Sequence, residues 1–449
     1  MAGQLISKLK NKHFLSLAGN AIMSLFGLVL IALLYRSLSV PELGMWIFFQ
    51  STVLLIDTFR SGFLTTAFIK FYAGTEETRA KEIMGSAWFI AIAITGIFLV
   101  LNIPAFLLVN VVHDPGLLLF LKWFGLTFIC TLPSFMASCK VQAEQRFDRL
   151  LYIRFVSQML FIGSILLLIV TKKNNLQNII YANLAASLIT SFFTILRGYS
   201  GIASFGNRTK QGIKELFNFG KYSVGTTLSA NLFRTSDTFI INFLLGPAAL
   251  AIYNLGQRLM EVIEIPLRSF AATAMPSLSA AYNQDKRDEV IYILKKYAGM
   301  LTVALVPVCI LCLFFADIPI NLIGGGKYAG TEAANVFRLF MTFALLFPAD
   351  RFLALTLDVI HQPRINFIKV LVMLAANIGG DFAGIAVFGN IYGVAITTVI
   401  PTLIGVLVGY YALRRYIAFS FWDMYRVGYN EIKELIQQQF RKRFNPNPR

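Results

Sequence analysis

The sequence has few charged side chains for a chain of 449 residues. Charged residues make up 14% of it, hydrophobic residues make up 57%, and the mean hydropathy is +0.66. Soluble domains carry about 25% charged residues. This composition therefore excludes a soluble globular protein, and it indicates a polytopic membrane protein with an all-α fold.

Residues that usually perform catalysis or bind metals are also scarce. The chain has 3 histidines, none of them beside an acidic cluster, and its predicted loops are short, so we expect no catalytic site and no enzyme activity. Its 4 cysteines lie in apolar runs, without a second cysteine pair or a nearby histidine that could complete a zinc site. We expect them to pack in the interior, and we expect no metal or other cofactor.

Long apolar runs, in contrast, are abundant, and about twelve of them are long enough to cross a bilayer. They lie at about 14–35, 43–71, 83–111, 117–139, 150–171, 176–196, 216–245, 248–282, 292–316, 332–358, 365–388 and 391–413. An even number of spans puts both termini on one side of the membrane.

The basic residues identify that side. If both ends are cytoplasmic, the loops there hold 29 of the 40 lysines and arginines, the opposite loops hold 4, and the remaining 7 lie within spans. Positive charge concentrates on the cytoplasmic side of membrane proteins. The bias therefore predicts cytoplasmic termini, and it accounts for the net charge of +17 without a nucleic-acid partner.

A basic stretch at 197–221 divides the spans six and six, and a repeat supports this division. Shifting the chain by 207 residues lays LSVPELGMW (38–46) on LGPAALAIY (245–253) and matches polar positions within the spans that follow. We therefore predict an N-terminal lobe at 1–198, a cytoplasmic linker at 199–215 and a C-terminal lobe at 216–416. The remaining segment, 417–449, alternates aromatic and basic residues, so we expect an amphipathic helix on the anionic cytoplasmic leaflet.

Charge within the membrane is concentrated in the seventh and eighth spans, at Arg234, Asp237, Arg258, Glu261, Glu264 and Arg268. Each charge at the centre of a span costs about 2.5 to 3.5 kcal/mol and is normally kept only beside a cavity or a partner. On the two sides of the turn at Gly246 and Pro247, Arg234 lies 11 residues before Leu245 and Arg258 lies 11 residues after Pro247. At about 1.5 Å per residue, both arginines are therefore expected near mid-membrane.

Each of these two spans has one polar face, which is compatible with two interpretations. Helical spacing groups Asn254 and Gln257 with three charges of the eighth span, and it groups Asn231 with Arg234 in the seventh. The three charges are Glu261, Glu264 and Arg268. One interpretation is a polar translocation cavity. The other is a set of ion pairs, Arg258 with Glu261 and Glu264 with Arg268, that only hold helices together.

The second span carries a related but smaller polar set. Asp57 and Arg60 stand three residues apart. In the repeat Asp57 corresponds to Glu264, Gln50 corresponds to Gln257, and Arg60 falls within one position of Arg268. Elsewhere, the run from Gly324 to Lys327 lacks the spacing of a phosphate loop and is predicted to be a periplasmic turn.

Several motifs resemble those of the Wzx-type polysaccharide flippases. They are LLYRSLSVPELGMW in the first hairpin, LFNFGKYSVGTTLSANLFRTSDTFIINFLLGPAALAIYNLGQRL, AMPSLSAAY and GGGKYAGTEA. That family belongs to the superfamily that also holds the MATE exporters and the peptidoglycan-precursor flippases. The sequence departs from MATE exporters by lacking a carboxylate in the first span, and from the peptidoglycan-precursor flippases by stopping at twelve spans.

This resemblance implies two six-helix bundles around a V-shaped cavity in a bacterial cytoplasmic membrane. Its cargo would be an oligosaccharide linked to undecaprenyl diphosphate, with a polysaccharide polymerase and glycosyltransferases as partners in the same process. Arginines would then hold the diphosphate and amides the glycan. The candidate substrate ligands are Arg60, Arg234, Arg258, Arg268, Gln50, Asn231, Asn254 and Gln257, and the candidates for ion coupling or charge pairing are Asp57, Asp237, Glu261 and Glu264.

Two other functions compete with this one. A cation-coupled small-molecule exporter would favour an acidic cavity, whereas the charged spans here carry arginines. A membrane glycosyltransferase would need catalytic groups at the membrane surface, and the sequence offers none. A lipid-linked oligosaccharide flippase is therefore the expected function.

Overall fold

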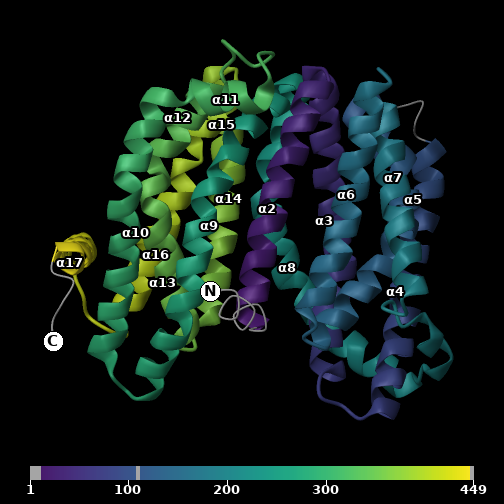
Figure 1. Ribbon diagram of the computed structural model, residues 1–449, viewed down its shortest axis with the longest axis horizontal. Coiled ribbons are helices and arrows are strands. Elements are labelled where there is room, and N and C mark those ends of the chain that lie inside the picture. Colours follow the sequence, from purple (N-terminus) through teal and green to yellow (C-terminus); the bar gives the residue numbers. More distant parts are fainter. Residues whose placement is uncertain (1–11, 108–111, 445–449) are drawn as a thin grey trace. The chain divides into compact units, whose positions relative to one another are not determined.

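The protein is built from long α-helices in each part that the computed structural model describes, residues 12–107 and 112–444 (Figure 1). The helices of the first half are α2 (Lys12–Ser37), α3 (Val40–Tyr72), α4 (Glu77–Leu107), α5 (Pro115–Ala143), α6 (Phe147–Val170) and α7 (Leu176–Leu196). After the 3-10 helix η2 (Ile202–Asn207) come α8 (Lys210–Leu245), α9 (Pro247–Asn283), α10 (Arg287–Phe315), α11 (Asp317–Gly324), α12 (Ala333–Phe343), η3 (Ala344–Leu346), α13 (Phe347–Val359), α14 (Pro363–Phe388), α15 (Ile391–Thr397), α16 (Val399–Arg414) and α17 (Asp423–Phe444).

Local sequence signals explain where these helices begin. Ser39 caps α3 by a capping box, in which its hydroxyl accepts from the Glu42 backbone and the Glu42 carboxylate accepts from the Ser39 backbone. Asp114 caps α5 by accepting from the Leu117 backbone at 2.6 Å, directly before Pro115. Apolar runs bounded by such caps therefore become discrete helices at the predicted positions.

Among the described residues, nine helices or helix pairs are long and apolar enough to cross a membrane. They include two predicted spans that are interrupted: α12 and α13 are separated by η3, and α15 and α16 by a break at Thr398. The more polar α8 and α9 and the first helix α2 occupy the other three predicted positions. The all-α polytopic fold predicted from the sequence is confirmed.

The chain forms two compact units. The first comprises the residues up to Thr238 together with Gly246–Ala251 and Ile323–Lys327, and the second comprises Phe239–Leu245, Ile252–Leu322 and the residues from Tyr328. In the first unit α5 packs against α3, α4 and α7, and in the second α13 and α16 pack against each other. The first unit thus takes in most of α8, and the lobe boundaries drawn from the repeat stay a prediction.

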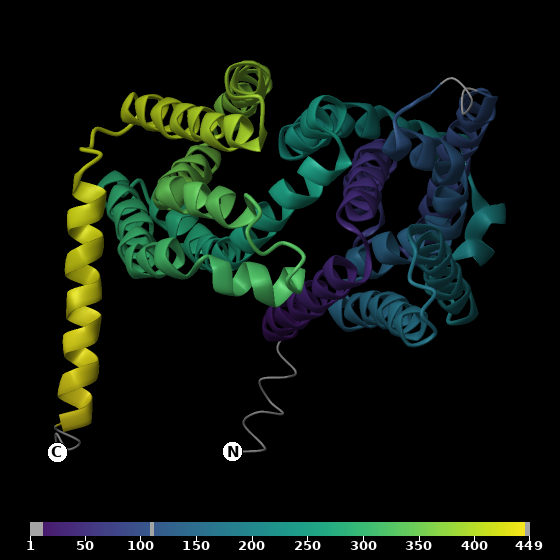
Figure 2. The ribbon, with the colours of Figure 1, turned by 90° about the horizontal axis from the view of Figure 1, so that it is seen from above.

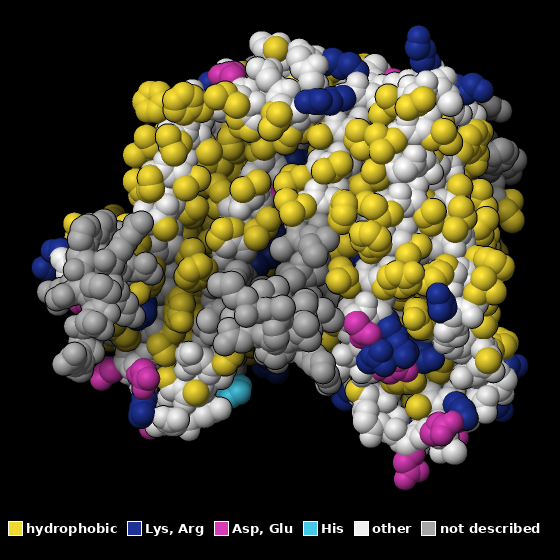
Figure 3. Space-filling view, viewed as in Figure 1, with side chains coloured by type: hydrophobic (Ala, Val, Ile, Leu, Met, Phe, Trp, Pro, Cys, Tyr) yellow, Lys and Arg dark blue, Asp and Glu magenta, His cyan; other side chains and the backbone are white. Residues whose placement is uncertain are grey.

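Apolar side chains cover the flanks of the helices, and charged side chains gather toward their ends (Figure 3). Val100, Val170, Phe314 and Val387 are among the large apolar side chains that are mostly exposed. Soluble proteins rarely expose contiguous apolar surface of this kind, whereas lipid accommodates it.

The turns of two repeat-related hairpins meet inside the first unit. A Cβ placed on Gly44 of α3 would lie 1.7 Å from the carbonyl oxygen of Pro247, at the start of α9. The Tyr35 hydroxyl donates to the carbonyl oxygen of Ala251 at 3.3 Å, and Ala251 is the repeat partner of Gly44. Only glycine allows this approach at position 44, so the motif LGMW determines how the two hairpins pack.

Candidate functional site: a polar cavity in the first unit

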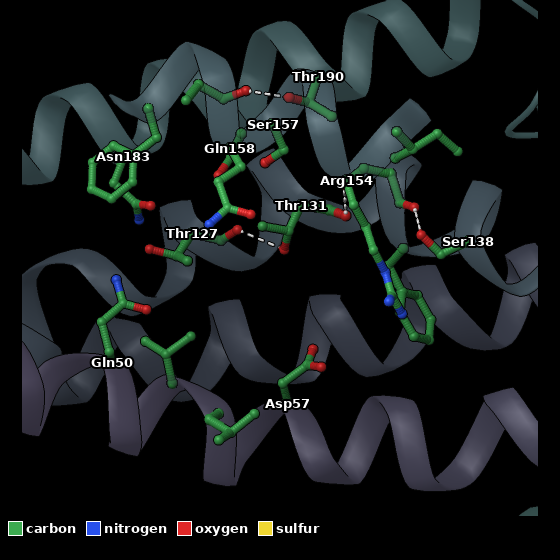
Figure 4. A pocket seen from close by; sticks show the side chains of 18 of the residues that line it. Gln50, Asp57, Thr127, Thr131, Ser138, Arg154, Ser157, Gln158, Asn183 and Thr190 are labelled. Atoms are coloured by element: carbon green, nitrogen blue, oxygen red, sulfur yellow. Dashed lines mark hydrogen bonds between the residues drawn. The ribbon is translucent and has the colours of Figure 1, made fainter. Parts of the chain in front are cut away.

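A cavity of about 620 Å³ lies within the first unit, between α2, α3, α5, α6 and α7 (Figure 4). Its size falls within the range of about 300 to 1,000 Å³ that is typical of small-molecule sites. Most helices around it are apolar on their outer faces, yet polar side chains from four of them line the cavity. They are Gln50, Asp57, Arg60, Thr127, Thr131, Ser134, Ser138, Arg154, Ser157, Gln158, Asn183, Ser187 and Thr190.

Arg60 is fixed in the wall of this cavity. Its guanidinium pairs with the Asp57 carboxylate at 2.6 Å and donates to the Phe128 carbonyl and the Thr131 hydroxyl, both at 3.2 Å. The same group lies over the rings of Phe128 and Phe135, 5.1 and 4.6 Å from their centroids. With its side chain 3% exposed, Arg60 holds α3 against α5, whereas Asp57 is 26% exposed and lines the cavity.

A second arginine, Arg154, extends from α6 into the cavity toward α3, on the side where Asp57 lies (Figure 4). Arg154 is exposed and makes no hydrogen bond or ion pair with any described residue. A guanidinium that offers five donors and has no such partner is suited to bind an anionic or strongly polar ligand.

The other end of the cavity is lined by amides. Figure 4 shows Gln50, Gln158 and Asn183 there, around Thr127. None of these three amides hydrogen-bonds to a described residue, so each can both donate to a ligand and accept from it. The Thr127 hydroxyl donates to the Trp123 carbonyl of its own helix at 2.9 Å, which leaves its oxygen able to accept. The wall is therefore suited to a ligand rich in hydroxyl groups.

The structure brings only three of the predicted site residues, Gln50, Asp57 and Arg60, to this cavity. On α8, Arg234 is exposed and makes no ion pair with a described residue, while Asp237 is buried. Asn231 donates to the Thr58 hydroxyl at 2.9 Å and so joins α8 to α3.

The predicted residues of α9, from Asn254 onward, belong to the second unit. Arg258 pairs with Glu261 at 2.7 Å and donates to the Asn254 side chain at 3.4 Å. Arg268 pairs with Glu264 one turn away. Gln257, which directly precedes Arg258, is half-buried. The two ion pairs expected from spacing on α9 are therefore present, and both are partly exposed.

Sequence reasoning missed Arg154, Gln158 and Asn183. Arg154 is one of the 29 cations predicted to lie in cytoplasmic loops, because it stands only four residues into the predicted span at 150–171, but α6 begins earlier, at Phe147. The signal that could have identified it is the spacing of Arg154, Ser157 and Gln158, which places three polar side chains on one face of an apolar helix.

A second polar cluster, also missed, is buried in the second unit. The Asp381 carboxylate of α14 is fully buried and accepts from the Asn377 amide at 3.2 Å and the Thr397 hydroxyl at 3.4 Å. Gly384 and Gly393 meet backbone to backbone, and this contact brings α14 and α15 together beside the cluster. On the same helix Lys369, also counted as a loop cation, is buried and pairs with Asp350 at 2.7 Å.

Solved structures with a similar fold are membrane transporters. One is an inward-facing multidrug resistance MATE family transporter of the MOP superfamily, with a TM-score of 0.72 and 16% identity over 88% of this chain and 94% of that one. Another is the lipid II flippase MurJ in an inward closed conformation, also with a TM-score of 0.72 and 16% identity, over 93% of this chain and 91% of that one. At such low identity these likenesses show the fold alone.

Sequence comparisons identify the family. A curated relative, the probable low-salt glycan biosynthesis flippase Agl15 of Haloferax volcanii, is 20% identical over 318 residues, which cover 71% of this chain and 66% of the relative's length. The sequence profile of the family described as polysaccharide biosynthesis protein matches residues 20–332, well over half of the chain. The resemblance drawn from the hairpin motifs is thereby confirmed, and the chain belongs to the polysaccharide biosynthesis protein family.

Proposed function

We propose that this protein is a flippase for an oligosaccharide linked to undecaprenyl diphosphate, the repeat unit of an O-antigen, a capsule or an exopolysaccharide. It moves this lipid by alternating access from the cytoplasmic to the periplasmic leaflet of a bacterial cytoplasmic membrane. The observation that carries the proposal is the polar cavity in the first unit, because a glycan needs hydrogen-bonding groups to leave water for the bilayer interior. The polyprenyl tail needs no such groups and stays in lipid.

The cavity supplies the glycan contacts. The amides of Gln50, Gln158 and Asn183 donate to and accept from sugar hydroxyls, and Arg154 binds the most polar or acidic sugar. The expected result of Gln158→Ala or Asn183→Ala is weaker glycan binding in a protein that still folds, because neither amide hydrogen-bonds to a described residue. Binding of a lipid-linked glycan to purified protein, measured beside its thermal stability, checks this.

Arg234 is the candidate that best fits the diphosphate. Of the four arginines predicted for this role, Arg234 alone makes no ion pair with a described residue, whereas Arg60, Arg258 and Arg268 each hold a carboxylate. An unpaired guanidinium can bind phosphate without giving up an existing partner.

The test compares Arg234→Gln with Arg258→Gln, a matched control whose arginine already has a carboxylate partner. The expected result is that Arg234→Gln loses export of surface polysaccharide and binding of a diphosphate-lipid analogue while its thermal stability in detergent is unchanged. Arg258→Gln should keep more of the binding. Full binding and export by a stable Arg234→Gln protein would show that the diphosphate is held elsewhere.

Carboxylates within the helices are candidates for coupling the cycle to an ion gradient. Asp57, Asp237, Glu261 and Glu264 were predicted for this role, and the buried Asp381 joins them. We expect Asp237→Asn or Asp381→Asn to change the dependence of transport on a proton or sodium gradient in proteoliposomes. Normal transport with unchanged gradient dependence in these variants and in Glu264→Gln would assign the carboxylates to helix packing alone.

The direction of transport depends on the predicted topology, which reporter fusions can test. Fusions after Lys173 and Lys327 should report the periplasm, and fusions after Arg208 and Arg449 the cytoplasm. A cytoplasmic signal at Lys327 would mean that the spans of the second half have the opposite orientation, which would contradict the predicted topology.

A cation-coupled small-molecule exporter is the alternative. The MATE-like fold and the buried carboxylates favour it, but neither provides a reason for Arg154 and Arg234, which form no ion pair with any described residue. Proteoliposomes distinguish the two functions: the flippase accelerates movement of a lipid-linked oligosaccharide between leaflets, whereas the exporter moves a cationic dye against its gradient. In cells that lack the flippase, the glycosyltransferases would still make the lipid-linked glycan, but the polymerase would not receive it. The glycan would therefore accumulate on the cytoplasmic side.

A further inference from the structure

The last helix, α17, lies across the spanning helix α10 rather than beside it. It is seen end-on in Figure 1 and at full length in Figure 2, which is turned by 90°. The two helices meet backbone to backbone: a Cβ on Gly299 of α10 would lie 1.9 Å from the Met424 carbonyl oxygen, and a Cβ on Gly428 would lie 2.1 Å from the Gly299 carbonyl carbon. Both belong to the second unit, so this crossing is a fixed feature of that unit.

Two acidic residues of α17 form ion pairs with lysines of α10 at the crossing. Lys295 pairs with Asp423 at 3.1 Å, and Lys296 pairs with Glu431 at 2.5 Å, with the Tyr292 hydroxyl donating to the same carboxylate. The hydrogen bond from Lys296 holds the pKa of Glu431 below its usual range, so this pair is charged at neutral pH. Two of the three carboxylates of α17 are thus neutralised by α10, which leaves the helix with an excess of positive charge.

The crossing lies at the depth where α10 changes from charged to apolar. Lys295 and Lys296 are the last charged residues before a stretch, Tyr297 to Phe315, that contains none. Those residues would span about 28 Å at about 1.5 Å per residue, close to the thickness of the hydrocarbon core. Gly299 stands just inside this boundary, so α17 lies where the hydrocarbon meets the lipid headgroups.

The face of α17 that points away from α10 combines aromatic and basic side chains. Arg426, Tyr429 and Lys433 of α17 are exposed, as is Trp422, which directly precedes the helix. At 3.6 residues per turn their spacing corresponds to an arc of about 60°. Trp422 is 75% exposed and Tyr429 57%. Tryptophan and tyrosine prefer the membrane interface, and basic side chains extend from there to headgroup phosphates. These four residues are the outer stripe of α17.

We propose that the outer stripe binds the anionic lipid headgroups of the leaflet at the charged end of α10, the leaflet predicted to be cytoplasmic. Its aromatic rings enter the boundary between headgroups and acyl chains, and Arg426 and Lys433 bind lipid phosphates. Charge complementarity favours this occupant over a second protein chain, because the stripe carries two cations and no anion. The sequence adds Arg441, Lys442 and Arg443 further along the same helix.

The test measures lipids retained by the full-length protein. The protein is purified from mixed vesicles of phosphatidylcholine and phosphatidylglycerol, and bound lipids are counted by native mass spectrometry. The double variant Arg426→Gln, Lys433→Gln should retain less than half as much phosphatidylglycerol as the unaltered protein. The matched control, Lys286→Gln with Arg287→Gln, removes two exposed cations at the start of α10 and should retain the full amount. Equal retention by both variants would overturn the proposal.

Tryptophan fluorescence supplies a second measurement on well-folded protein. In vesicles containing brominated lipids, part of the fluorescence should be quenched, and Trp422→Phe should remove that quenched part. Adding phosphatidylglycerol should strengthen the quenching, and Gly428→Leu should weaken it by separating α17 from α10. If Trp422 is not quenched, or if its signal changes only when two copies are cross-linked, the stripe contacts a protein and the proposal fails. Neither measurement requires transport, so the outcome is independent of the proposed function.

Discussion

The repeat-related helices α3 and α9 carry matching ion pairs that differ in their surroundings. On α3, Arg60 is almost fully enclosed by α5, with its carboxylate partner, a carbonyl, a hydroxyl and two rings around it. On α9, Arg268 is 59% exposed, and its partner Glu264 is 43% exposed. A similar ion pair within one helix therefore holds the first unit together, whereas in the second unit it stays partly exposed. Position in a repeat does not determine whether a charge serves stability or function.

The largest difference between the two pairs is expected for loss of Arg60. Arg60→Gln leaves Asp57 without its cation and should destabilise the first unit by about 3 to 5 kcal/mol, the cost of breaking a buried pair from one side. A large fall in the thermal unfolding temperature in detergent measures it. The double variant Asp57→Asn, Arg60→Gln should recover part of the loss. An unfolding temperature close to that of the unaltered protein would show that Arg60 is not what holds α3 against α5.

An intermediate effect is expected at the turns where the two hairpins meet. Gly44→Ala places a methyl group against the Pro247 carbonyl and should cost about 1 to 3 kcal/mol, because backbone cannot move aside as a flexible side chain can. Gly96→Ala in α4 is the control, since a Cβ there meets nothing within 4 Å. Equal stability of the two variants would show that the close approach is not required.

The smallest effect is expected for the pair on α9. Arg268→Gln should change stability by no more than about 0.5 kcal/mol, because exposed ion pairs contribute little. The measurement is again thermal unfolding, with Arg60→Gln run beside it. A loss at Arg268 as large as that at Arg60 would mean that the two pairs serve the same purpose after all.

The sequence predicted the fold better than the site, and particular residues show why. Spans could be located because apolar length is a local property, and caps such as Ser39 and Asp114 mark where helices begin. The cavity, however, depends on which faces of five helices turn toward one another. Arg154 and Asn183 lie on different helices, and only packing brings both to one cavity.

Ion pairs follow the same distinction. Pairs within one helix, such as Arg258 with Glu261, can be predicted from spacing and are present. Lys369 with Asp350, which joins α14 to α13, could not be predicted from spacing, because the two residues lie on different helices. Arg60 combines both cases. Its pairing with Asp57 can be predicted from their spacing on α3, but its burial against α5 depends on how the helices pack.

The glycine-rich turn at 324–327, predicted to be only a turn, ends in a lysine that completes another helix. The Lys327 ammonium donates to the carbonyl oxygens of Arg36 at 2.8 Å and Leu38 at 3.0 Å, where α2 ends. Helix ends leave carbonyls without partners, and a cation there is stabilising. Lys327 follows Leu38 by 289 residues. At about 5 to 20 residues per second of synthesis, the first hairpin waits roughly 15 to 60 seconds for this cap. A ribosome that stops before residue 327 therefore leaves a first hairpin in the membrane whose first helix lacks this cap.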